Sequence, residues 1–139
     1  MSALRLAAGI QSVCGGRIAA IDTEARRMLH YAERFKFDYL EFGAPFGSDR
    51  YLEAAEAAVA TGAKTVIFDS MSHEHDGPGG MLEQHAAVVE AKGQSHNMTA
   101  WIRPKADHNA MKHFILQQRC NWVFCFRAKE KTKPKADGK

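Results

Sequence analysis

Three short polar segments of the chain carry residue types that could act on a phosphate group. Residues 22–24 (Asp-Thr-Glu), 69–70 (Asp-Ser) and 127–129 (Arg-Ala-Lys) each follow an apolar run. A carboxylate after such a run can hold Mg²⁺, a second carboxylate can orient an attacking water, and cations neutralise phosphate charge. The pattern favours a phosphate substrate with a metal, with Asp69 and Glu24 as the acids and Arg127 and Lys129 as the cations. The alternative for each segment is a helix N-cap or a solvated loop.

A histidine pair follows the second of these segments. His73 and His75 lie two residues apart, so on an extended segment they would point the same way and could bind zinc, with Asp69, Asp76 or His85 as a third ligand. This alternative predicts a metal-dependent hydrolase. The glycines within residues 77–80 instead favour a mobile loop over the site.

An aromatic and basic stretch lies further along the chain. Trp101 could stack on an unpaired base while Arg103 and Lys105 contact phosphates, as in proteins that bind single strands. This predicts a non-enzymatic module that binds single-stranded nucleic acid. The alternative is that Trp101 packs on the sheet.

The elements that must position these groups alternate between strand and helix. Apolar and β-branched runs predict strands at residues 17–22, 37–42, 64–70 and 121–126. Helical spacing predicts helices at residues 2–13, 23–35, 49–61, 81–92 and 107–119, with Ser48 as the cap of the third. This order predicts an α/β fold with a mostly parallel sheet, whose strands bring their carboxyl ends to one edge.

These segments carry a resemblance to a known family. The apolar strand that ends in Asp69-Ser70 resembles the Walker B strand of the RecA-like P-loop NTPases. The strand that ends in residues 22–24 is similar to the strand of that family whose trailing Glu activates water. The segments SHEHDGPGGMLEQ and RAKEK resemble phage-encoded RecA-like ATPases of the AAA family, some of which act in DNA recombination or single-strand annealing.

The resemblance covers most of residues 1–131 and implies a three-layer RecA-like fold that binds ATP and Mg²⁺. It implies catalytic roles for Glu24 and Asp69, and a place for Ser70 beside the metal. Arg127 or Lys129 would sense the γ-phosphate, across a subunit interface in a homo-oligomer. It also favours single-stranded DNA as a partner.

One motif of that family is missing. The chain contains no G-x-x-x-x-G-K-[ST] loop, whose backbone amides and lysine would cradle the phosphates. Residues 1–10 resemble the helix that follows this loop, so we expect an N-terminal truncation that removes the first strand and the loop. In that family the loop-bearing strand lies beside the Walker B strand, so the sheet would lack a central strand. We therefore expect this chain to be inactive as an ATPase on its own.

Length, charge and cysteine usage set the remaining expectations. The chain has 139 residues and a formal net charge of +3, which suits one domain over residues 1–131 followed by a basic tail at residues 132–139. Three cysteines without a C-x-x-C pair favour a reducing bacterial or phage-infected host cytosol over a disulfide scaffold. No apolar run approaches the roughly 20 residues that span a bilayer, so we expect no membrane partner.

Overall fold

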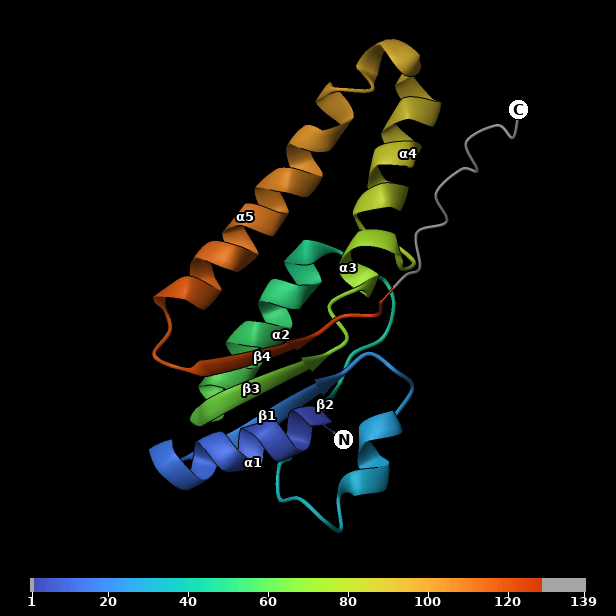
Figure 1. The fold of residues 1–139 in the computed structure, drawn as a ribbon. Coiled ribbons are helices and arrows are strands. Elements are labelled where there is room, and N and C mark those ends of the chain that lie inside the picture. Colours follow the sequence, from blue (N-terminus) through green and yellow to red (C-terminus); the bar gives the residue numbers. More distant parts are fainter. Residues whose placement is uncertain (1, 129–139) are drawn as a thin grey trace, which may run out of the picture.

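Four parallel strands form the sheet in the computed structural model, which describes residues 2–128 (Figure 1). Their order within these residues is β2-β1-β3-β4, and their bounds are β1 Arg17–Asp22, β2 Asp38–Glu41, β3 Ala63–Asp69 and β4 Asn121–Cys125. The expected α/β fold is confirmed, and the sheet is parallel at each of its three pairings. Lys129 and residues 132–139, the predicted tail, lie outside the described residues.

The two middle strands are covered on both faces. In β3, Val66, Ile67 and Phe68 are each fully buried, as expected for a continuous apolar run in a central parallel strand. One face of the sheet packs against α2 (Ser48–Ala60) and α5 (Ile102–Gln117). The other face packs against α1 (Ser2–Cys14), which gives the expected three layers.

Strand β3 has hydrogen-bonded neighbours on both sides, β1 and β4. The resemblance implies a missing central strand beside β3; the described strands leave no such gap, because β1 and β4 pair with β3 on its two sides.

The predicted helix at residues 23–35 is wrong. The structure has only a short 3₁₀ helix there, η1 (Arg27–Tyr31). The Asp22 carboxylate accepts hydrogen bonds from backbone N–H groups of this segment, as described below. Ala25 and Arg26 lie in the left-handed region, with φ of 52° and 66°, which an α-helix does not allow.

Two further helix predictions need correction. Ser48 does not cap α2: the cap position is Gly47, and the Ser48 hydroxyl donates instead to Glu74. The segment with His73 and His75, expected to be extended or part of a mobile loop, forms the short helix α3 (His73–Asp76). The glycines that follow α3 fit a close approach, because a Cβ at Gly77 would lie 2.7 Å from the His73 carbonyl oxygen.

Helices α4 (Met81–Lys92) and α5 form an arm that projects beyond the sheet (Figure 1). The predicted helix at residues 107–119 begins earlier, at Ile102, because Pro104 is accommodated in its first turn. Two 3₁₀ turns, η2 (Gln94–His96) and η3 (Thr99–Trp101), join the two helices at the tip.

Candidate functional site

The carboxyl ends of β1, β3 and β4 meet in register at one edge of the sheet. Asp22 pairs with Asp69, and Asp69 pairs with Cys125. Because these three positions are level, the segments that follow them, with Glu24, Ser70 and Arg127, leave the sheet side by side. The prediction that the three polar segments meet at one edge is therefore confirmed.

The buried carboxylate of Asp22 organises the segment after β1. Its Oδ1 accepts the Glu24 N–H at 2.7 Å, and its Oδ2 accepts the Met28 N–H at 3.0 Å and the Tyr39 hydroxyl at 3.0 Å. Burial and the bond with Asp22 raise the pKa of Tyr39 to about 12. These bonds replace the expected helix and fix the backbone of Glu24. Sequence reasoning placed Asp22 in the polar cluster but missed this anchoring role.

Side chains also fix Ser70 at the end of β3. The Thr23 hydroxyl oxygen accepts the Ser70 N–H at 2.7 Å and donates to the Ser70 carbonyl at 3.2 Å. The Tyr51 hydroxyl donates to the same carbonyl at 2.7 Å. The Ser70 Oγ accepts the N–H of Ser72 at 3.0 Å. Ser70 is therefore held rigidly next to Asp69, as the predicted neighbour of a metal site would be.

Glu24 has a different partner on each of its two oxygens. Arg127 Nη2 donates to Oε2, and His73 Nε2 lies 3.4 Å from Oε1. Oε1 is buried and accepts no hydrogen bond from the described residues. Because only 10% of the Glu24 side chain is exposed, this oxygen is an acceptor that still lacks a donor.

Asp69 is paired with an arginine that sequence reasoning did not single out. Arg27 Nη2 donates to Asp69 Oδ2 at 2.9 Å and Oδ1 at 3.1 Å, and this bond raises the pKa of the Arg27 guanidinium. The sequence offers no signal for Arg27, since it lies in a segment that was expected to be helical. Burial and the nearby Asp69 raise the pKa of the Cys125 thiol on the neighbouring strand.

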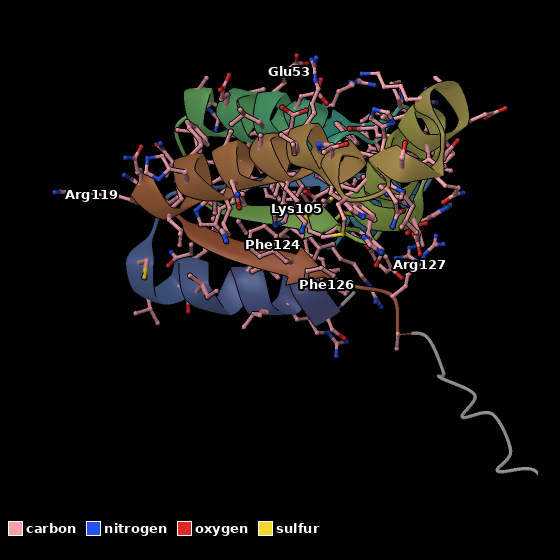
Figure 2. The ribbon with its side chains drawn as sticks, turned by 90° about the horizontal axis from the view of Figure 1, so that it is seen from above. Glu53, Lys105, Arg119, Phe124, Phe126 and Arg127 are labelled. Carbon is pink, nitrogen blue, oxygen red and sulfur yellow. The ribbon has the colours of Figure 1, made fainter. Side chains whose placement is uncertain are left out.

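One polar pocket of about 230 Å³ contains these groups. Its lining includes Ser2 and Ala3 from the first turn of α1, together with Glu24, Arg27, Asp69, Ser70, Cys125, Phe126 and Arg127. Four predicted site residues, Glu24, Asp69, Ser70 and Arg127, thus share a single pocket. Figure 2 shows Arg127 at the opposite end of the molecule from Arg119.

The histidine pair is arranged differently from the expectation. His73 and His75 lie on helix α3 rather than on an extended segment, so side chains two residues apart point to different sides. His73 stacks on Phe46 at 4.6 Å and faces Glu24, whereas His75 is exposed. Within residues 2–128, no group of three His, Cys, Asp or Glu side chains is arranged to hold a metal ion by itself.

The proposed nucleic-acid contacts lie on the arm and not in the pocket. Trp101 is half-buried and stacks on His85 at 4.1 Å, so it packs η3 against α4. Arg103 is exposed and lies 3.9 Å from Asp107, and Lys105 is exposed on α5. The packing alternative expected Trp101 to pack on the sheet. Its ring contact is instead with α4.

No helix in the described part of the chain is long and apolar enough to cross a membrane. Comparisons of the chain with protein-family models, curated proteins and solved structures gave no match, so the geometry of the pocket carries the functional argument.

Proposed function

We propose that the carboxyl-edge pocket binds the phosphate groups of ATP together with Mg²⁺, as part of a RecA-like ATPase. The observation that carries the proposal is the convergence of two carboxylates and two arginines on one pocket that also contains the first turn of α1. The backbone N–H groups of a first helical turn lack intrahelical partners and favour anions.

The carboxylates and arginines of the pocket are paired with each other and can exchange these partners for Mg²⁺ and phosphate. In the structure Glu24 pairs with Arg127 and Asp69 pairs with Arg27. Both arginine side chains are more than half exposed, so each guanidinium can turn from its carboxylate to a ligand without entering the protein interior. When Mg²⁺ and a phosphate enter together, the carboxylate of Asp69 can turn to the metal and the arginines to the phosphate oxygens.

The residues present fit a magnesium site completed by phosphate. Mg²⁺ usually takes one or two protein carboxylates, substrate phosphates and waters, and Asp69 beside the Ser70 hydroxyl supplies such a partial set. Bound Mg²⁺ would neutralise charge on the phosphate oxygens. Glu24 would accept a hydrogen bond from the attacking water at Oε2, the oxygen that becomes available when Arg127 turns to the phosphate.

The volume of the pocket limits what it holds. Sites for drug-sized ligands measure roughly 300–1,000 Å³, and this pocket measures about 230 Å³. It suits the phosphates, and the nucleoside would lie outside it. Because no Gly-Lys-Ser/Thr loop is present, we expect weak binding by this chain. A role in phage-type DNA recombination or annealing, single-stranded DNA as a partner, and a homo-oligomer belong to the same proposal and rest on the sequence resemblance.

The test is a titration with Mg²⁺ and the non-hydrolysable ATP analogue AMP-PNP, followed by amide NMR shifts, which detect weak binding. We expect shifts at Ser2, Glu24, Ser70 and Arg127, and their loss when Mg²⁺ is omitted or in Asp69→Asn. Arg127→Ala should weaken binding, while Arg119→Ala, which removes the same charge at the far end of the molecule (Figure 2), should not. An absence of shifts at the pocket in the wild-type protein would overturn the proposal.

A further inference from the structure

The two partners of Glu24 differ in how firmly they are held. Arg127 lies just beyond β4, and 56% of its side chain is exposed. Its backbone N–H donates to the Ser72 hydroxyl at 2.7 Å. Among the described residues, its side chain hydrogen-bonds to Glu24, and it lines two neighbouring pockets. Long exposed side chains exchange rotamers readily, so Arg127 is the partner that can leave.

Both the ring and the backbone of His73 are closely packed. Its ring stacks on Phe46 with the planes 20° apart, and only 16% of its side chain is exposed. Its backbone accepts the N–H of Gly77 at 2.9 Å. A Cβ at Gly77 would lie 2.8 Å from the His73 Cβ, and one at Gly80 would lie 2.7 Å from the His73 carbonyl oxygen. His73 is therefore the partner that stays.

We propose that His73 is a positioning residue that keeps Glu24 aimed into the pocket after Arg127 has moved to a bound phosphate. This inference rests on the proposed function. With Arg127 gone, neither oxygen of the Glu24 carboxylate would have a hydrogen-bond donor to fix its orientation. In the tautomer that carries its hydrogen on Nε2, His73 can close the present 3.4 Å separation from Oε1 to a hydrogen bond.

A double-mutant cycle on anion affinity isolates this contact. His73→Phe keeps an aromatic ring for Phe46 but removes the donor, and should weaken binding of AMP-PNP with Mg²⁺ by about three- to tenfold. In the Glu24→Gln background, which has no carboxylate to orient, the same substitution should have no effect. His73→Gln keeps an N–H donor and should restore most of the affinity. His113→Phe, at an exposed position on α5, is the matched control and should leave affinity unchanged.

A second measurement uses the wild-type protein, so it does not depend on the folding of any variant. Addition of AMP-PNP with Mg²⁺ should shift the ¹⁵N signals of both Arg127 Nε and His73 Nε2, the latter toward a hydrogen-bonded value.

The outcomes separate the two proposals. An equal loss of affinity in the wild-type and Glu24→Gln backgrounds, or no loss in either, would overturn the role of His73 and leave the phosphate site standing. A shift at Arg127 without one at His73 would do the same. No binding by the wild-type protein would overturn both.

Discussion

Two glutamates with histidine neighbours differ in their surroundings: Glu74 is buried on helix α3, and Glu24 follows β1 with 10% of its side chain exposed. Glu74 Oε1 accepts the Ser48 hydroxyl at 2.7 Å and lies 2.5 Å from His108 Nδ1. These partners come from α2 and α5, so the Glu74 carboxylate joins three helices. Glu24 instead meets an exposed arginine and leaves one oxygen without a donor. A carboxylate with satisfied bonds stabilises a junction, whereas one with an unmet bond is available for a ligand.

The largest expected effect separates the two glutamates by stability. Glu74→Ala leaves Ser48 and His108 without their shared acceptor and should lower the free energy of unfolding by about 2–4 kcal/mol. Glu24→Ala removes a carboxylate whose Oε1 has no donor, and should cost less than about 1 kcal/mol. Urea unfolding of both variants measures the difference, and equal losses would contradict the distinction.

A smaller effect compares one partner from each site. Ser48→Ala removes one of the two groups that bind the Glu74 carboxylate, and should cost about 1 kcal/mol. Arg127→Ala removes an exposed partner of Glu24 and should change stability by less than about 0.5 kcal/mol, although it weakens phosphate binding. Raising the salt concentration should leave the Ser48→Ala loss unchanged, because this bond is buried. A loss of stability in Ser48→Ala that depends on salt would argue against a buried Ser48–Glu74 hydrogen bond.

The last prediction concerns pH and the Tyr39–Asp22 hydrogen bond next to Glu24. The pKa of Tyr39 is raised to about 12 in the folded protein, against about 10 in an unfolded chain. Between these values the folded state holds the proton more tightly. The contribution of Tyr39 to the free energy of unfolding is therefore fully present below pH 10 and is lost as the pH rises toward 12. Tyr39→Phe should show a shallower loss of stability over this range in thermal unfolding. An unchanged slope would mean that another group is responsible.

The sequence predicts best where a single local pattern decides the structure. Apolar runs such as Val66-Ile67-Phe68 specify their strands, and the register of parallel strands then brings Asp69 and Glu24 to one edge. The failures have non-local causes. The segment after Asp22 has helical spacing, but the Asp22 carboxylate competes for its amides.

The same limit applies to partners. Ser48 has the right residue type for a cap, yet a carboxylate 26 positions away takes its hydroxyl. The pairing of Arg27 with Asp69 and the contact of His73 with Glu24 each join segments distant in sequence. The acids of the site could therefore be predicted from the sequence, but their counter-charges could not.

The two glutamate environments meet at adjacent residues of α3, because His73 contacts Glu24 and Glu74 contacts His108. Among homologous chains, this separation should be visible as two sets of positions that are replaced together. A replacement at position 24 should be accompanied by replacements at 73 or 127, and one at position 74 by replacements at 48 or 108. The two sets should drift independently of each other, although a single peptide bond joins them.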